Sequence, residues 1–387
     1  MILILCILSF ASGTAAEDSN SFYLMDWHLS NYSTSWVARF DSATNSMRSS
    51  QGCLDYGHWY MNINTKCEAE LFSTVGIRYR NYLHDDHRKH LLKNYFDLFF
   101  QLKKDLRLFF TAAPTYYKGE NELGIGIFIG KNYLNCLEAS YIIEDLDRNA
   151  SLKYEPDGPD KIIYNKYPIK LTSYFNKYWK TGHLTLKFEV TNTYKLQSTE
   201  PIEIHQPNYQ EKGFHRYFHI GFWQDIDKLR FGAIFDLQQL KHYESDLDTE
   251  AFKKNMVSII TEPMIAYKLT EKWRPHFYLT YNYKAEDDSI HVFSSHENTR
   301  IHYRRNIYAY LFDIEFHPGG NFIWHFGMQR QFYYNNQGID FKERRFTLGF
   351  ECYNKNVSFY IVEAMEGDFP TPKWLHNRTY VQLMLRF

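Results

Sequence analysis

The chain has 387 residues, a net charge of -1 and an aromatic content of 18%. A near-neutral chain without a basic tract lacks the electrostatic footprint of a nucleic-acid-binding protein. After the N-terminal region no run of about 18 apolar residues occurs, which excludes membrane-spanning helices. Membrane-spanning strands, with aromatic girdles at both interfaces, would account for 32 tyrosines and 31 phenylalanines.

The first sixteen residues have the pattern of a secretory signal peptide. An apolar run after Met1 is followed by small residues that end at Ala16, before the acidic pair Glu17 and Asp18. This order of an apolar core and a small-residue cleavage site predicts removal of residues 1–16. Residues 17–387 would then form the mature protein, as a single β-barrel domain.

Residues 17–70 allow two interpretations. Alternation of apolar and polar side chains over 32–40 and 59–63 indicates two strands joined by a polar loop, 41–55. The alternative is a periplasmic extension or small plug outside the barrel wall. The first interpretation gives about eighteen strands in total and the second gives about sixteen.

Four cysteines remain after cleavage. Cys53 and Cys67 lie close enough in sequence to form a disulfide across one hairpin in an oxidising compartment. Unpaired thiols are the alternative, and Cys352 falls on a position expected to face lipid. No Cys-x-x-Cys motif occurs, so a zinc or haem site of that kind is not expected.

From Leu71 onward, segments of about ten residues alternate strictly between two faces, as expected for tilted spanning strands. In residues 123–130 one face carries a leucine and three isoleucines, and the other carries three glycines and Phe128. The segments 96–102, 184–191 and 308–316 repeat this pattern, with their charges on one face only.

The predicted connections alternate in length. Short links are expected at 103–106, 131–135, 176–182, 224–228, 271–273, 317–321 and 353–356. Longer polar loops are expected at 81–93, 147–167, 194–212, 239–255, 285–305, 333–344 and 365–377. Short turns at one end and long loops at the other are typical of outer-membrane barrels.

The C-terminal segment alternates between Val381, Leu383 and Leu385 on one face and polar or long side chains on the other, and it stops at Phe387. This segment resembles the closing strand of a bacterial outer-membrane β-barrel, where the last residues are also the assembly signal. The resemblance implies an all-β, antiparallel, up-and-down transmembrane barrel in the bacterial outer membrane. The implied partners are outer-membrane lipids and, through the last strand, the barrel assembly machinery.

Two motifs could support a hydrolase instead. The segment 84–90 contains His84, Asp86 and His87 at a predicted extracellular rim, where the outer-membrane proteases called omptins also mount Asp and His. The order of His28 and Ser30 is similar to the start of a motif in outer-membrane phospholipase A, and the hydroxyl could be activated by the imidazole. A solvated loop and a polar start to the first strand are the favoured explanations of these residues.

The inward face of a wide barrel determines what passes through it. The alternation places charged side chains of both signs on that face: Arg78, Arg80, Asp97, Lys187, Glu189, Arg230, Asp236, Asp313, Glu315 and His325. The sequence therefore favours a porin-like channel for passive diffusion of small hydrophilic solutes. It predicts no catalytic residue, metal ion, cofactor or nucleic acid, and it leaves open a homo-oligomer. A barrel hydrolase, phospholipase or protease, and a non-conducting structural barrel are the alternatives.

Overall fold

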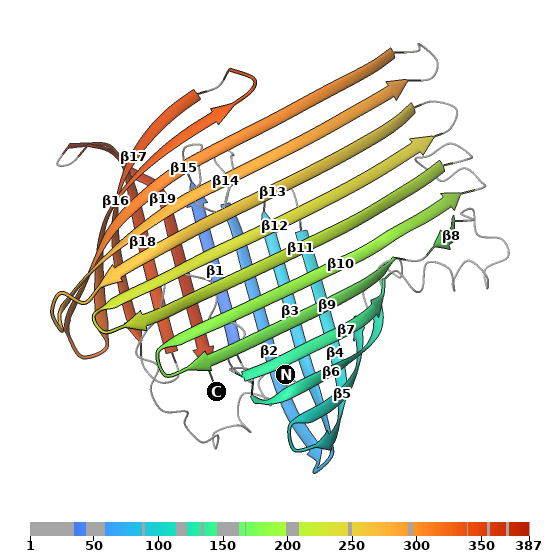
Figure 1. The fold of residues 1–387 in the computed structure, drawn as a ribbon, viewed down its shortest axis with the longest axis horizontal. Coiled ribbons are helices and arrows are strands. Elements are labelled where there is room, and N and C mark those ends of the chain that lie inside the picture. The colour runs from blue at the N-terminus through green and yellow to red at the C-terminus, as the bar shows by residue number, and fades with distance from the viewer. Residues whose placement is uncertain are drawn as a thin grey trace.

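In the computed structural model, nineteen strands form one antiparallel sheet (Figure 1). The structure describes residues 35–43, 59–86, 90–113, 122–132, 135–144, 162–166, 168–198, 209–246, 250–292, 297–338, 340–353, 357–368 and 371–386. Over these ranges, no helix is long and apolar enough to cross a membrane.

The strands follow one another along the chain. They are β1 (Ser35–Ala43), β2 (Trp59–Phe72), β3 (Val75–Asp86), β4 (His90–Lys103), β5 (Leu106–Ala113), β6 (Glu122–Asn132), β7 (Asn135–Ile143), β8 (Ile162–Lys166), β9 (Ile169–Trp179), β10 (Gly182–Ser198), β11 (Tyr209–Ile226), β12 (Leu229–Asp246), β13 (Glu250–Tyr267), β14 (Trp273–Val292), β15 (Glu297–Gly319), β16 (Phe322–Asn335), β17 (Asp340–Tyr353), β18 (Val357–Asp368) and β19 (Thr371–Arg386).

Consecutive strands pair along the chain, except that β7 pairs with β9. β1 pairs with both β2 and β19, so the pairings return to the first strand. The two segments β8 and β9 both pair with β10. Pro168 lies between them and has no amide hydrogen to donate. Nineteen segments thus occupy eighteen positions, the larger of the two expected numbers. The all-β, antiparallel, up-and-down architecture expected from the sequence is confirmed.

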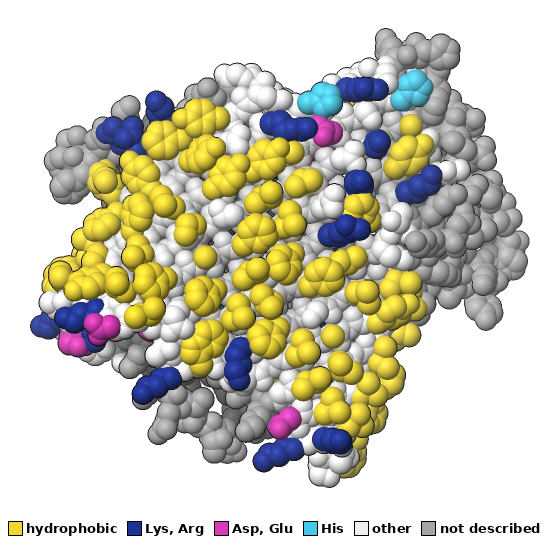
Figure 2. All heavy atoms as spheres, in the orientation of Figure 1, with side chains coloured by type: hydrophobic (Ala, Val, Ile, Leu, Met, Phe, Trp, Pro, Cys, Tyr) yellow, Lys and Arg dark blue, Asp and Glu magenta, His cyan; other side chains and the backbone are white. Residues whose placement is uncertain are grey.

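The two faces of the sheet differ as the alternation predicts. On β6, Leu123, Ile125, Ile127 and Ile129 are 39 to 47% exposed, whereas Phe128 between them is 2% exposed. Exposed apolar side chains recur on most of the other strands, and Figure 2 shows them spread over the outer surface of one wall. The outward face is therefore apolar, and the opposite face contains the buried polar residues.

Several expected loops are corrected by the structure. The predicted loop 239–255 is mostly strand, because β12 continues to Asp246 and β13 begins at Glu250. Both flanking strands also run into the expected loops 81–93, 194–212, 285–305, 333–344 and 365–377. Apolar alternation stops before the strands end, but antiparallel backbone pairing continues beyond it, so hydropathy underestimates strand length.

The wall has two heights. The segments β5 to β9 contain 5 to 11 residues, whereas β10 to β15 contain 17 to 23. The long strands form the broad oblique wall in Figure 1, and the short ones form its lower continuation. Ser35 pairs with Arg386, so the first and last strands meet at the end where the short turns lie.

Candidate functional site: a charged network inside the barrel

Arg78 on β3 connects strands that are not neighbours. Its Nε donates to Asp97 on β4, and its Nη1 and Nη2 donate to the two carboxylate oxygens of Glu138 on β7 at 2.8 and 3.1 Å. Because β4, β5 and β6 separate β3 from β7, only side chains that project into the barrel can make this contact. The Arg78 side chain therefore projects into the barrel interior.

Arg80, two residues further along β3, extends the same network. Its Nη2 donates to Asp97 at 2.9 Å and to the Thr111 hydroxyl on β5 at 3.3 Å. The Asp97 carboxylate thus lies between two guanidinium groups, and its side chain is fully buried. A buried carboxylate is tolerated here because both charges are paired and hydrogen-bonded.

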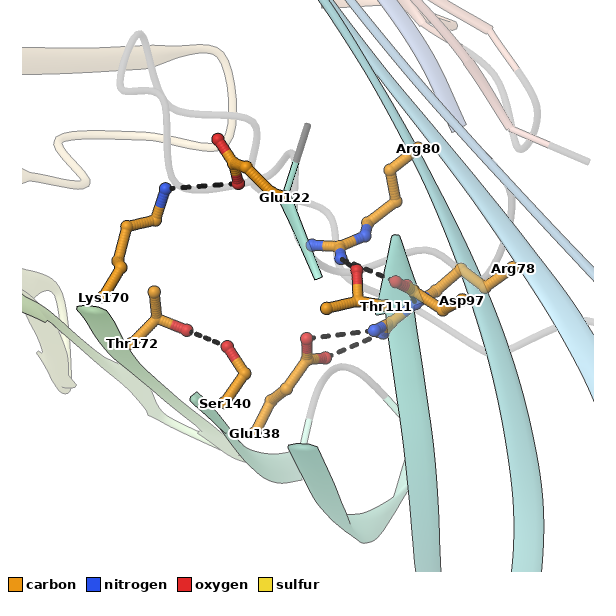
Figure 3. A network of polar contacts seen from close by, with 9 residues as sticks. All are labelled: Arg78, Arg80, Asp97, Thr111, Glu122, Glu138, Ser140, Lys170 and Thr172. Carbon is orange, nitrogen blue, oxygen red and sulfur yellow. Dashed lines mark hydrogen bonds and ion pairs between the residues drawn. The ribbon is translucent and has the colours of Figure 1, made fainter. Parts of the chain in front are cut away.

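A second group of charges lies across from Arg80, nearer the long-loop end (Figure 3). Lys170 at the start of β9 contacts Glu144 at 2.9 Å and Glu122, the first residue of β6, at 3.7 Å. Ser140 on β7 and Thr172 on β9 share a hydroxyl hydrogen bond of 2.6 Å. These polar groups surround an open space in the interior.

That space is a polar cavity of about 360 Å³. Its lining comes from β3, β4, β7, β9 and β10, and it includes Arg78, Arg80, Glu138, Lys170, Lys187 and Glu189. Four cations and two carboxylates thus face one volume, together with hydroxyls of Ser140, Thr172 and two tyrosines, Tyr95 and Tyr174. The cavity can accept hydrated polar solutes and ions.

Aromatic rings pack together below this network, on the part of the wall near the short turns of β4 to β7. Phe99, Phe109, Phe128 and Cys136 are buried together, with Tyr174 packed against them. Gly126 makes room for Phe109, since a Cβ at residue 126 would lie 2.2 Å from that ring. The Arg107 guanidinium lies over the rings of Phe99 and Phe128, at 5.0 and 5.3 Å from their centroids. The Arg78 guanidinium also lies over the Phe109 ring, at 4.9 Å from its centroid, so this packing contacts the charged network above it.

Another buried polar cluster lies near the short turns of β14 to β17. Glu315 contacts His276 and His317, each at 3.1 Å. His325 contacts Asp313 at 3.1 Å and Glu351 at 3.7 Å. All of these pairs join neighbouring strands or one strand, so they brace the wall and do not cross the interior.

The structure places the sequence-predicted lumen residues in different environments. Arg78, Asp97, Asp313, Glu315 and His325 are buried, and the other five are partly buried. Lys187 and Glu189 join Arg78 and Arg80 at the cavity. Arg230 instead binds Asp225 near a short turn, with Nη2 and Oδ2 2.6 Å apart. Asp236 accepts hydrogen bonds from Tyr217 and His219, both at 2.8 Å.

Sequence reasoning missed Glu138, Lys170, Glu122 and Thr111, which complete the network. Glu138 shares its face with buried Cys136, so extending the alternation through β7 would have found it. Lys170 lies beside the predicted long loop 147–167, where the pattern of hydropathy does not indicate which side chains face the interior.

Some expectations lie outside the described residues. These are the signal peptide, His28 and Ser30, and the Cys53 partner of the expected disulfide. The side chains of Cys67 and of the segment 84–90 are not described either. Cys352 is a free thiol, and Cys136 is buried. Among the side chains that are described, no group of three His, Cys, Asp or Glu could hold a metal ion.

Comparison with known proteins gave matches among solved structures only. No protein-family model matches the chain, and no curated protein matches it. One similar structure is CdiB from Acinetobacter baumannii, at 8% identity and a TM-score of 0.40. The match covers 91% of this chain and 59% of CdiB, so the chain spans less than two thirds of that protein.

Two others are matched over almost their whole length. The outer membrane channel DcaP of Acinetobacter baumannii has 9% identity and a TM-score of 0.38, with 92% of this chain and 96% of that chain covered. Outer-membrane expressed OmpT of Vibrio cholerae has 8% identity and a TM-score of 0.33, with coverages of 91% and 95%.

Proposed function

We propose that this protein is a bacterial outer-membrane channel that passes small hydrophilic solutes by diffusion through the barrel interior. One observation supports the proposal above the others: the two faces of the same sheet have opposite polarity. The outward face exposes residues such as Leu279 and Ile127, while the inward face carries paired charges and the cavity at Arg80 and Lys187. An apolar exterior suits lipid, and a polar interior suits water and ions.

The architecture fits this assignment. Eighteen strand positions correspond to a barrel wide enough to enclose an aqueous channel. The start of β1 and the end of β19 lie at the same end of the barrel as the short turns. In such barrels this end is the periplasmic side. The long strands β10 to β15 would then rise beyond the outer leaflet. In this proposal the last strand, Thr371–Arg386, is also the segment that the assembly machinery recognises.

Conductance of the purified mature protein in a planar lipid bilayer tests the channel. We expect stable open steps, with ion selectivity measured from a salt gradient. Folding is checked by heat-dependent electrophoretic migration. If the folded barrel shows no conductance, the channel proposal is rejected and a non-conducting structural barrel is favoured.

The hydrolase alternative is tested by assays of phospholipid and peptide cleavage, which do not depend on conductance. His28→Ala and Ser30→Ala would abolish cleavage of phospholipid without changing conductance, and Asp86→Ala would do the same for peptide cleavage. The channel proposal predicts no such activity in the unaltered protein.

A further inference from the structure

The upper part of β15 forms an open edge of the sheet. β15 pairs with β14 from Glu297 onward, but with β16 only from Arg305 onward. Figure 1 shows β15 along the top of the oblique wall, where its upper end extends beyond β16. No described strand pairs with residues 297–303 on the side away from β14. At the opposite edge of this wall, the end of β10 is covered by β8. We call residues 298–302 the open edge.

Hydrogen bonds to Asn336 show which backbone groups point away from β14. Asn336 lies in the turn after β16. Its backbone N–H donates to the Arg304 carbonyl oxygen at 3.1 Å, and its side-chain oxygen accepts from the Arg304 N–H at 2.9 Å. Its side-chain amide donates to the His302 carbonyl oxygen at 2.7 Å. Alternate residues of a strand direct their backbone groups to the same side. The N–H of His302 and the N–H and C=O groups of Arg300 and Asn298 therefore also point away from β14.

The open edge is regular and accessible. Natural sheets protect such edges with proline, a β-bulge, charged side chains or a covering segment. Residues 297–305 contain no proline, and their register with β14 runs without a shift. Residues 298–302 are exposed on both faces of the sheet. Among the described residues, charge is the one protection present, and it disfavours a strand of like charge but not every strand.

The height of the wall places the open edge in water. Arg300 is nineteen positions along β15 from Gly319, which lies at the short turn. At about 3.3 Å per residue and a tilt of about 45°, this corresponds to roughly 44 Å across the membrane. The apolar band of such barrels is only ~25 Å tall. In the proposed orientation the open edge therefore lies outside the cell, beyond the lipid.

One face of the open edge favours an acidic partner. Arg300, His302 and Arg304 alternate along β15 and share this face. Asp287 on β14 contacts His302 and Arg304, each at 2.8 Å. The residue opposite Arg300 on β14 is instead the neutral Ser289. Opposite charges in a cross-strand pair are stabilising and like charges are destabilising, so an added strand would be stabilised by a carboxylate opposite Arg300.

The other face of the open edge favours apolar side chains. It carries Thr299 and Ile301, followed by Tyr303. Ile301 is 46% exposed, although it lies on the face that is buried further down the strand, at Ile307. Aromatic and β-branched side chains form favourable cross-strand pairs. A matching strand therefore alternates carboxylates with β-branched residues.

We propose that the open edge of β15 binds an extended acidic segment of another protein outside the cell, as an added β-strand. Backbone hydrogen bonds along the edge give affinity, and the alternating side chains give specificity. Carboxylates of the segment meet Arg300, and β-branched residues between them meet Ile301. This inference rests on the proposed membrane placement and not on conduction.

A second copy of this chain does not fit the open edge in the same membrane. Two copies in one membrane are related by rotation about the membrane normal. Strands tilted by about 45° then differ in direction by at most about 90°, whereas antiparallel pairing needs opposite directions. Parallel pairing would need both copies in the same orientation, and their open edges would then face the same way instead of each other. The occupant is therefore a different polypeptide.

The test is binding of a synthetic peptide of alternating glutamate and valine to the full mature protein in neutral detergent. The dissociation constant is measured by nuclear magnetic resonance, from line broadening of an isotope label in the peptide, which detects weak binding. One control peptide has lysine in place of glutamate. Another control peptide keeps glutamate and valine but has N-methylated backbone amides, so it keeps its charge and loses its N–H donors.

Two proline variants block the open edge. Arg300→Pro removes an N–H that points away from β14, so it prevents pairing with an added strand without breaking a bond to β14. Arg300→Gln is its matched control, because it removes the same charge and keeps the N–H. Asn298→Pro blocks the edge without a change of charge, and it replaces Arg300→Pro if that variant does not fold. Heat-dependent migration verifies folding, and conductance of the same preparations separates this test from that of the channel.

We expect either proline variant to weaken binding of the glutamate peptide by about tenfold or more, since one backbone hydrogen bond alone contributes roughly two- to tenfold. Arg300→Gln should weaken it by about twofold to fivefold, the effect of one cross-strand charge pair. The lysine peptide and the N-methylated peptide should both bind more weakly than the glutamate peptide to the unaltered protein.

Equal binding of the N-methylated and the glutamate peptides would overturn the proposal, because charge alone would then explain the affinity. Equal weakening by Arg300→Pro and Arg300→Gln would overturn it for the same reason. Absence of peptide binding to the unaltered protein would reject the edge as a binding site. Self-association of the unaltered protein that Arg300→Pro abolishes would also overturn the proposal, because the edge would then pair with a second copy.

Discussion

Arg78 on β3 binds both carboxylate oxygens of Glu138 on β7, across three intervening strands. Neighbouring strands are held together by backbone hydrogen bonds. This side-chain contact instead joins β3 to β7, which share no backbone hydrogen bonds. The ion pair therefore fixes the curvature of the barrel between β3 and β7, where the wall is low.

Replacing Glu138 with glutamine should destabilise the barrel. The side chain keeps its shape but loses its charge, so the buried Arg78 guanidinium loses one of its two described anionic partners, Glu138 and Asp97. We expect the free energy of unfolding to fall by about 1–3 kcal/mol. Urea titration in lipid vesicles measures it, with Glu144→Gln as control because Lys170 keeps Glu122. A midpoint equal to that of the unaltered protein would show that the crossing contact does not contribute to stability.

Lys187 and Glu189 should change ion selectivity in opposite directions. Both line the polar cavity, and they carry opposite charges. Lys187→Gln should shift the permeability ratio toward cations and Glu189→Gln toward anions. Each shift should be below about fivefold, since one charge in water contributes about 1 kcal/mol at 4 Å. Reversal potentials in a salt gradient give the ratios, and shifts of the same sign would place the ion path elsewhere.

Gly126→Ala should strain the interior. The new Cβ would lie 2.2 Å from the Phe109 ring and 2.6 Å from the Ala139 carbonyl oxygen. Overpacking of this kind costs about 1–3 kcal/mol. Combining the change with Phe109→Leu should recover part of the loss, because it removes the ring but leaves the carbonyl contact. If the single variant unfolds at the unaltered urea midpoint, the packing around Phe109 is looser than described.

A charge on the outward face tests the placement in the membrane. Ile127 on β6 and Tyr334 on β16 are 39% and 38% exposed, so burial does not distinguish them. Ile127 lies mid-strand and Tyr334 near the long-loop end of its strand. Ile127→Arg should destabilise the barrel by about 2–4 kcal/mol and Tyr334→Arg by about 0–1 kcal/mol.

Folding free energies in vesicles and in a lipid-free detergent check this prediction. The difference between the two variants should exist in vesicles and shrink in detergent, because a micelle adapts to the charge. Equal costs for both variants in vesicles would mean that depth in a bilayer has no role.

The alternation at Leu123 to Ile129 shows what could be predicted. Successive side chains of a strand point to opposite faces, so strand identity and outward face follow from local sequence. Strand ends could not be predicted in the same way, because β12 to β15 continue as paired polar strands after the apolar pattern stops. Their extension depends on a partner strand being present at each position, which is a nonlocal property.

The sequence by itself determined that the chain forms antiparallel strands with one apolar face, and it determined which charges lie on the other face, because side-chain alternation is a property of the extended backbone. Only the tertiary structure decided that Arg78 meets Glu138 and that Lys170 meets Glu122. Those pairs join strands that are not neighbours in the sheet, so they depend on how sharply the wall curves and on which inward side chains the curvature brings within reach.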